Sequence, residues 1–325
     1  MSNNSSTNIS PIEYASAGCT IGSSVLSICG AFVIFWTYGR ISSVRNFQRT
    51  LLTWLTIADL MIATGNLVGT IDFLSNKGGN NDVCIAQSVV TTFASMASFF
   101  WTLVITAHMM VSIQFRSDKT RSALLKFLYH LICWGLPGII TLVAGLRGVL
   151  GRNSNSTTAV TGSWCWIKND LPYQERITWM LITGKGWEIL CYILSFSILV
   201  LLKLKLYLSR RRLRELNEDF RDQDTHYLYL WLLLWLLRVW GTVRFILVCS
   251  QSDDNVAFLI ILHSIGDSAQ AFGNCLLFCL LDNAVMEYVK NMCKCSRLER
   301  VELERLVHTL DGSTNNGQRG SYSTV

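Results

Sequence analysis

The sequence is poor in charged residues and in proline, and both shortages narrow the kind of protein that it encodes. Asp, Glu, Lys and Arg make up 15% of the 325 residues, against roughly 25% in an ordinary soluble domain. This excludes a disordered chain and a nucleic-acid-binding one, since both need far more charge. Only 3 prolines interrupt the chain, 50% of the residues are hydrophobic, and the mean hydropathy is +0.34. The composition therefore indicates a helical protein that crosses a membrane several times.

Seven apolar stretches are long enough to cross a bilayer as helices. A bilayer core takes about 20 apolar residues in helical form, because no backbone polar group can face lipid unpaired. The stretches cover residues 14–37, 48–74, 84–114, 122–147, 174–206, 226–250 and 256–281. We therefore expect an all-α membrane protein whose seven-helix domain covers 14–281. A segment over 1–13, a membrane-surface helix over 282–297 and a cytoplasmic tail over 298–325 complete the expected domain order.

Basic residues are distributed unevenly between the two sets of connections. When residues at the ends of the stretches are counted with the adjoining side, one side, which includes the chain after the last stretch, holds 20 of the 28 Lys and Arg residues and the other holds 5. The remaining 3 lie deep within the stretches. Because cytoplasmic loops carry the excess of Lys and Arg, we expect the N-terminus outside the cell and the C-terminus inside. The glycosylation sequons agree, because all fall on the outer side. They begin at Asn3, Asn4, Asn8 and Asn155.

Two of the 11 cysteines lie on the expected outer side and are candidates for a disulfide. Cys84 opens the third stretch, and Cys165 lies in the longest outer loop. An oxidising compartment favours a bond between them over two free thiols, and the bond would hold the loop over the helix end. Most of the other cysteines lie inside apolar runs, where they are packing residues, so a small disulfide scaffold is excluded.

Ionisable residues occur inside three of the stretches, where they are costly and usually face the interior of the bundle. They are Lys185 and Glu188 in 174–206, Arg238 and Arg244 in 226–250, and His263 and Asp267 in 256–281. Spacings of three and four residues place both members of the first and third pairs on one helix face. Counted from the helix ends, four of the six lie near mid-membrane, and Arg244 and His263 lie nearer the outer surface.

Two interpretations of these six residues stay open. They are structural pairs that join neighbouring helices, which is ordinary in membrane proteins, or they line a polar pocket that binds a ligand from outside. Three helices that converge at one depth favour a pocket, because a single pair would suffice to join two helices. The candidates for its apolar walls, each of them individually more often a packing residue, are Phe99, Phe100, Trp101, Trp187 and Trp240.

A second polar site is expected in the stretch 48–74. Asp59 is an isolated carboxylate there and needs a partner or water, and Asn274, on the inner half of the last stretch, is a candidate partner. His108, near the inner side of 84–114, is interpreted as an interior histidine with one hydrogen bond. Because His108 and His263 lie at opposite depths, they cannot share a metal, and we expect no metal, cofactor or catalytic site.

Several uncommon motifs, taken in order, resemble those of orphan G-protein-coupled receptors with affinities to the secretin-type and cyclic-AMP-receptor-type families. They are Ser95–Trp101, Gly162–Ile167, Thr183–Glu188, Leu237–Phe245, Leu262–Gly266 and Asn274-Cys275. The resemblance extends from about Leu51 to Phe278. It implies a receptor of unassigned ligand that couples to a heterotrimeric G protein, and it implies the Cys84–Cys165 disulfide.

The resemblance also marks which positions this chain shares with the family. Four of the six intramembrane ionisable residues match charged family positions, whereas Asp267 departs, because the resemblance implies an uncharged amide there. Arg116 lacks the acidic neighbour of the rhodopsin-type third-helix motif, and no Asn-Pro-x-x-Tyr ends the last stretch. A rhodopsin-type switching scheme is therefore not expected.

The expected mechanism is a ligand-biased rearrangement of the helices. An outer segment of about 13 residues is too short for a hormone-binding domain, so a ligand must bind among the helices and outer loops, or the receptor is active without one. A ligand at the charged residues would bias a closed against an open bundle. The open bundle would admit a G-protein helix into a cytosolic groove. The basic residues over 203–214 would form a rim beside this groove, or they are simply the excess of positive charge that is typical of the inner side.

The sequence disfavours three other classes of membrane protein. A seven-helix transporter or channel-like protein would show inverted repeats or broken helices, and no repeat is found. A retinal-binding protein would need a Schiff-base lysine in 256–281, which has none. An intramembrane enzyme would need a paired metal or nucleophile constellation, and the sequence contains none.

The tail carries short motifs of lower specificity. Residues 282–292 predict an amphipathic helix on the inner leaflet, and the Cys293 and Cys295 that follow are candidates for palmitoylation. The final Ser323-Thr324-Val325 fits a ligand of a PDZ domain. We expect the protein in the plasma membrane, and the sequence does not distinguish a cilium from the rest of the cell surface.

Overall fold

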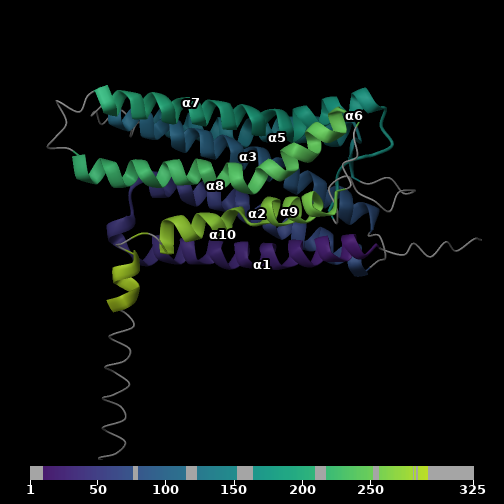
Figure 1. Cartoon of the computed structure of the whole chain (residues 1–325), viewed down its shortest axis with the longest axis horizontal. Coiled ribbons are helices and arrows are strands. Elements are labelled where there is room, and N and C mark those ends of the chain that lie inside the picture. The colour runs from purple at the N-terminus through teal and green to yellow at the C-terminus, as the bar shows by residue number, and fades with distance from the viewer. Residues whose placement is uncertain are drawn as a thin grey trace, which may run out of the picture.

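In the computed structural model, the described residues are 10–75, 80–114, 123–151, 164–208, 217–251, 256–280, 282 and 285–291. Nearly all of them are helical, and the long helices lie side by side along one axis (Figure 1). Those without interruption are α1 (Pro11–Arg40), α2 (Phe47–Ser75), α3 (Asn81–Gln114) and α8 (Asn217–Cys249). A 3₁₀ turn at Ser42–Val44 joins α1 to α2. The fold is therefore a helix bundle.

Two further helices are continuous but contain a π-helical segment. In the first, α4 (Ala123–His130) passes through Leu131–Gly135 into α5 (Leu136–Leu146). In the second, α6 (Tyr173–Met180) passes through Leu181–Lys185 into α7 (Gly186–Leu208). A π-helical segment adds a residue to one turn, so it rotates the side chains that follow, and such segments are frequent at functional sites.

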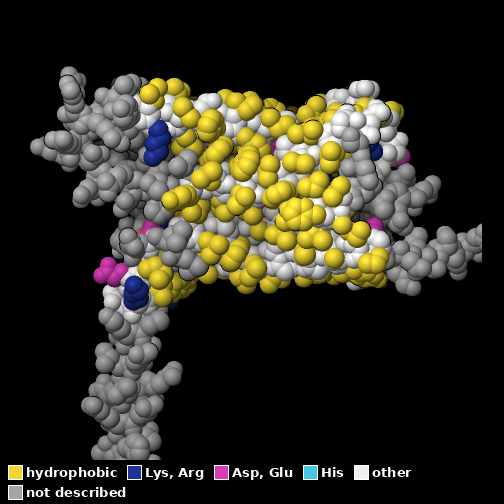
Figure 2. Space-filling view, in the orientation of Figure 1, with side chains coloured by type: hydrophobic (Ala, Val, Ile, Leu, Met, Phe, Trp, Pro, Cys, Tyr) yellow, Lys and Arg dark blue, Asp and Glu magenta, His cyan; other side chains and the backbone are white. Residues whose placement is uncertain are grey.

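Six helices of the described residues are long and apolar enough to cross a membrane, and each lies over one of the first six predicted stretches. Hydrophobic side chains cover the visible long side of the bundle, while Lys, Arg, Asp and Glu are seen toward its ends (Figure 2). This distribution is what lipid around the sides and water at the ends require. The prediction of an all-α membrane protein is confirmed.

The last predicted stretch, 256–281, is not one helix. It consists of α9 (Ala257–Ser268) and α10 (Gln270–Cys275), which are separated by Ala269, and a π-helical segment at Leu276–Leu280 follows α10. The two pieces lie in line beside α1 (Figure 1), and each is shorter than the helices above. The sequence predicted a seventh membrane span over this stretch but did not locate the break, because an apolar run does not show where a neighbouring helix interrupts the backbone hydrogen bonds.

The interruption is made by a side chain from α1. The Ser27 hydroxyl donates to the Ser268 carbonyl at 2.5 Å and accepts from the Phe272 backbone N–H at 3.3 Å. These two backbone groups would bond to each other in an uninterrupted helix, and such an insertion is a known cause of helix kinks. From α2, the Asn66 amide donates to the Ser268 hydroxyl at 3.0 Å. Two neighbouring helices therefore hold the break.

Backbones approach closely on both sides of this broken helix. A Cβ built on Gly266 would lie 1.8 Å from the Leu237 carbonyl oxygen of α8, and one built on Gly30 of α1 would lie 3.0 Å from the Phe272 Cα. Small residues at helix interfaces allow such close approaches. The resulting van der Waals contacts hold helices together in lipid, where the hydrophobic effect does not drive their association. Glycine is thus required at Gly266.

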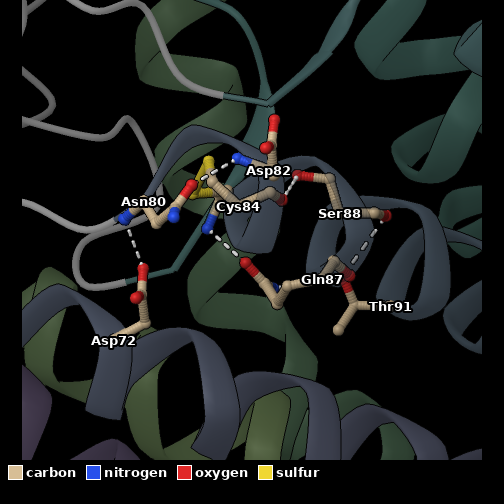
Figure 3. The surroundings of a disulfide bond; sticks show 8 residues. Asp72, Asn80, Asp82, Cys84, Gln87, Ser88 and Thr91 are labelled. Atoms are coloured by element: carbon tan, nitrogen blue, oxygen red, sulfur yellow. Dashed lines mark hydrogen bonds between the residues drawn. A yellow bond between two sulfur atoms is a disulfide. The ribbon is translucent and has the colours of Figure 1, made fainter.

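A short hairpin covers one end of the bundle. The strands β1 (Leu150–Gly151) and β2 (Trp166–Ile167) pair antiparallel. Next to β2, Cys165 is disulfide-bonded to Cys84 at the start of α3, as predicted (Figure 3). The Gln87 side-chain oxygen accepts from the Cys165 backbone N–H at 2.8 Å. The hairpin is therefore fixed over the helix ends by a covalent bond and by a hydrogen bond one turn further along α3.

A short helix over residues 285–291 lies at the opposite end of the bundle and points away from the bundle axis (Figure 1). Asp282 begins it, because its carboxylate accepts from the Val285 backbone N–H at 3.2 Å and pairs with Arg49 of α2. Val285 is buried, and the Tyr288 ring meets Trp36 edge-on at 6.3 Å. The rest of the predicted surface helix lies outside the described residues.

Replacing Gly266 by alanine tests the contact between α8 and α9. The new Cβ has no room beside the Leu237 carbonyl, so we expect a loss of about 3 kcal/mol, the upper end for overpacked sites, and a thermal midpoint lower by about 5 °C. The measurement is thermal unfolding in lipid nanodiscs. Gly18→Ala is the matched control, because nothing lies within 4 Å of its built Cβ. Equal midpoints for the two variants would contradict the close approach.

Candidate functional site

A cavity opens between the helices beneath the hairpin. Empty space of about 510 Å³, its open mouth included, lies between side chains from α2, α3, α7, α8, α9 and the hairpin. Five of the six intramembrane ionisable residues predicted from the sequence line it; they are Lys185, Glu188, Arg238, His263 and Asp267. The sixth, Arg244, contacts His263 of the cavity wall.

Glu188 is the most fully bonded charge of the cavity. One carboxylate oxygen accepts from the Lys185 ammonium at 2.8 Å, three residues earlier on the same chain. The other accepts from the Tyr192 hydroxyl at 2.9 Å and from the Thr242 hydroxyl of α8. Glu188 is 2% exposed and Lys185 is 5% exposed. The buried carboxylate therefore joins α7 to α8.

Glycines make room for this cluster. A Cβ on Gly241 of α8 would lie 2.6 Å from His263 Nε2 and 2.8 Å from Lys185 Nζ. A Cβ on Gly184 would lie 3.0 Å from the Trp166 ring. Lys185 is also the last residue of the π-helical segment before α7. The local sequence Thr183-Gly184-Lys185-Gly186 thus leaves space for a ring on one side and aims a cation at the cavity on the other.

A chain of polar contacts runs from Arg244 to Arg238. Arg244 Nη1 lies 3.2 Å from His263 Nδ1, His263 Nε2 lies 3.1 Å from an Asp267 oxygen, and Arg238 Nη1 lies 3.7 Å from the other oxygen. Because a guanidinium only donates, Nδ1 must accept, and Nε2 then carries the hydrogen that Asp267 accepts. The network assigns His263 as neutral. At 3.7 Å, Arg238 and Asp267 attract each other without a hydrogen bond.

Arg238 is buried with part of its hydrogen-bonding capacity unused. Its side chain is 3% exposed, and its guanidinium carbon lies 5.1 Å from the centre of the Phe99 ring. Within the described part of the chain, its Nε and Nη2 have no hydrogen-bond partner, and the same holds for Asp267 Oδ1 and Asn66 Oδ1. Unpaired buried polar atoms are costly and call for an explanation.

The inner polar site brings Asp59 of α2 together with two partners. One carboxylate oxygen accepts from the Asn274 amide of α10 at 2.8 Å, and the other accepts from the Ser98 hydroxyl of α3 at 2.6 Å. Sequence reasoning named Asn274 and missed Ser98, whose only signal was a hydroxyl at the same depth in the neighbouring stretch.

The aromatic walls of the cavity differ from those predicted. Of the five predicted residues, Phe99 lines the cavity. Trp101 is fully buried and stacks on Trp54. Trp187 packs on Phe100, and Trp240 packs on Phe258. The hairpin residues Trp164 and Trp166 line the cavity in their place. The sequence does not show how each helix is rotated about its axis. It also does not show that the disulfide places the Trp164 and Trp166 rings against the cavity.

Other predicted residues have no part in the cavity or are not described. His108 lies in α3, and its Nδ1 is 3.4 Å from the Tyr129 hydroxyl. The residues outside the described part of the chain are the sequon residues Asn3, Asn4, Asn8 and Asn155, the tail cysteines Cys293 and Cys295, and the terminal Ser323-Thr324-Val325.

Replacing Glu188 by glutamine tests the pairing inside the cavity. The change removes the negative charge beside Lys185, and breaking a buried pair costs about 3–5 kcal/mol. We expect the thermal midpoint in nanodiscs to fall by about 6 °C or more. Tyr192→Phe removes one neutral donor to the same carboxylate and is expected to cost only about 1 kcal/mol. Equal effects of the two substitutions would show that the charge of Glu188 is not needed.

Known proteins match most of the chain. The family model described as slime mold cyclic AMP receptor matches residues 14–240. G-protein coupled receptor 157 of Homo sapiens is 32% identical over 282 residues, which cover 83% of this chain and 82% of that protein. Cyclic AMP receptor 1 of Dictyostelium discoideum is 28% identical over 146 residues, 45% of this chain and 33% of that protein. The chain therefore belongs to the slime mold cyclic AMP receptor family of membrane receptors, with G-protein coupled receptor 157 among its relatives.

Proposed function

We propose that the chain is a G-protein-coupled receptor with seven membrane spans, its N-terminus outside the cell and its C-terminus in the cytosol. In this proposal α9, α10 and the π-helical segment Leu276–Leu280 together form the seventh span, since they lie in line. The excess of Lys and Arg on one side supports the orientation. So does the Cys84–Cys165 disulfide at the other end, because such bonds persist in oxidising compartments.

The observation that carries the proposal is one interrupted helix that connects the cavity with the inner polar site. Asp267 of α9 faces Arg238 in the cavity, and Asn274 of α10 holds Asp59 below it. Between them, Ser27 occupies the break at Ala269. A ligand that changes the contacts of Asp267 would tilt α9 relative to α10, and any difference in its affinity for the two arrangements shifts their populations.

The proposed partner at the cytosolic end is a heterotrimeric G protein. G-protein coupled receptor 157 is named for G-protein coupling, and a helix-in-groove contact between opened helices is the kind of recognition that a bundle offers. The basic rim expected at residues 203–214 lies mostly outside the described side chains, and its charges would meet acidic protein or lipid surfaces.

The predicted modifications complete the proposal. Glycosylation at Asn3, Asn4, Asn8 and Asn155 would mark the outer face, and palmitoylation at Cys293 and Cys295 would hold the helix over 285–291 on the inner leaflet. Ser323-Thr324-Val325 would bind a PDZ domain. We place the receptor in the plasma membrane, with the ciliary membrane as one part of it.

A transporter or channel-like protein is the second candidate, and the broken helix favours it, because transporters bind substrates at such breaks. In transporters the unwound carbonyls face the substrate, whereas here the Ser268 carbonyl accepts from Ser27. This difference makes the receptor the better supported proposal. Substrate uptake by proteoliposomes containing the protein would reverse that order.

The experiment that tests the receptor proposal is second-messenger profiling in cells, with cyclic AMP and calcium measured together. Compared with the unmodified receptor, Glu188→Gln and Arg244→Gln are each expected to change the signal by about fivefold or more, because a change of 1 kcal/mol between states has that effect. Arg40→Gln, at the exposed end of α1, is the matched control.

Surface expression is measured in the same cells with tags at both ends. The N-terminal tag is expected to be labelled on intact cells, and the C-terminal tag only after permeabilisation. A signal that both substitutions leave unchanged at equal surface expression would contradict the role of the cluster, and simultaneous labelling of both tags on intact cells would contradict the topology.

A further inference from the structure

The unpartnered atoms of the cavity fall into two groups of opposite kind. Arg238 contributes two unused donors, Nε and Nη2, which share one edge of the guanidinium. Two parallel N–H groups on one edge match the two oxygens of a carboxylate. Asp267 Oδ1 and Asn66 Oδ1 contribute unused acceptors. Asn66 is fixed by its bond to the Ser268 hydroxyl, on the residue after Asp267, so the two acceptors belong to one region of the wall.

The charges that line the cavity are balanced. Lys185 and Arg238 carry two positive charges, Glu188 and Asp267 carry two negative charges, and the contacts of His263 assign it as neutral. Beyond this lining lie Arg244, which contacts His263, and Asp59, which accepts from Asn274 and Ser98. A ligand with a net charge would leave that charge uncompensated in a buried site surrounded by lipid, which is costly. A ligand that carries both signs avoids this cost.

The contact between Arg238 and Asp267 is open to insertion. The two side chains attract each other at 3.7 Å without a hydrogen bond, whereas Lys185 and Glu188 are bonded at 2.8 Å. Because Arg238 Nε and Nη2 are buried, a ligand reaches them by separating Arg238 from Asp267. That separation would move α8 relative to α9, as the proposed function requires.

We propose that the cavity binds a small zwitterion whose carboxylate is held by Arg238 and whose ammonium group is held by Asp267 and Asn66. The ligand must be small, because the empty space of about 510 Å³ includes the open mouth of the cavity. The rings of Phe99, Trp164 and Trp166 on its walls favour an apolar or aromatic side chain. This inference rests on the proposed function, because it names the class of ligand that the same site takes.

The test is thermal stabilisation of the full-length protein in lipid nanodiscs by the proteinogenic amino acids, each at about 10 mM. A ligand at ten times its dissociation constant is expected to raise the midpoint by about 3 °C. For each amino acid that stabilises the protein, the N-acetylated form, which is an anion, and the amide form, which is a cation, are measured beside it. We expect the zwitterion to stabilise and both derivatives to lose the effect.

Three variants assign the effect to the cavity. Asp267→Asn and Arg238→Gln are each expected to weaken binding by at least about tenfold, since each removes one partner of a charge-assisted bond. If Arg238→Gln does not fold, Arg238→Lys keeps the charge without the planar edge and is expected to weaken carboxylate binding as well. Arg40→Gln removes a charge at the far end of α1 and is expected to bind as the unmodified protein does.

Each outcome decides the proposal. Stabilisation by zwitterions that is lost in the cavity variants supports it. Stabilisation by none of the amino acids, equal stabilisation by a zwitterion and its N-acetylated form, or full binding in Asp267→Asn overturns it. The proposed function is judged separately: a receptor that signals in the second-messenger assay while no zwitterion binds loses only the ligand class, whereas binding without any signal contradicts G-protein coupling.

Discussion

Charged side chains inside a bundle surrounded by lipid need partners within the protein, and the rest of this structure depends on that constraint. Glu188 meets it with three donors from two helices. Asp267 meets it with His263 and with a looser contact to Arg238. Since α7, α8 and α9 each supply members of the network, no one of these helices can move without changing the pairing of the others. The need to pair buried charges therefore links the three helices.

The second consequence concerns the helix that carries Asp267. Its backbone ladder is opened at Ala269 by the Ser27 hydroxyl, which bonds the Ser268 carbonyl and the Phe272 N–H that the break separates in the apolar interior. A break that is satisfied by a neighbouring side chain can bend at lower cost than a continuous helix. It separates Asp267, which faces the cavity, from Asn274, which holds Asp59. The family membership and this arrangement together support a receptor in which an outer signal reaches an inner site.

Much of this was predictable from the sequence, for physical reasons that also set the limits. Because a lipid environment requires long apolar runs, the sequence located six of the membrane-spanning helices. Because buried charge is costly in lipid, the sequence also identified Lys185, Glu188, Arg238 and Asp267 as one set. The pairing of Asp59 with Asn274 followed from depth alone. The break at Ala269 was missed, because Ser27 lies 241 residues away in the chain from the Ser268 carbonyl that it bonds. The sequence did not identify Trp164 and Trp166 as cavity walls. The position of their loop depends on the disulfide and on tertiary contacts, which the hydrophobic periodicity of the sequence does not reveal.

The most direct measurement of the central claim is a double-mutant cycle between Arg238→Gln and Asp267→Asn, read as the free energy of unfolding in lipid nanodiscs. If buried charges across α8 and α9 depend on each other, each single change leaves its partner uncompensated, and the double variant loses less than the sum by about 1 kcal/mol or more. Losses that add to within about 0.5 kcal/mol would show that the two charges act independently, and would contradict the account.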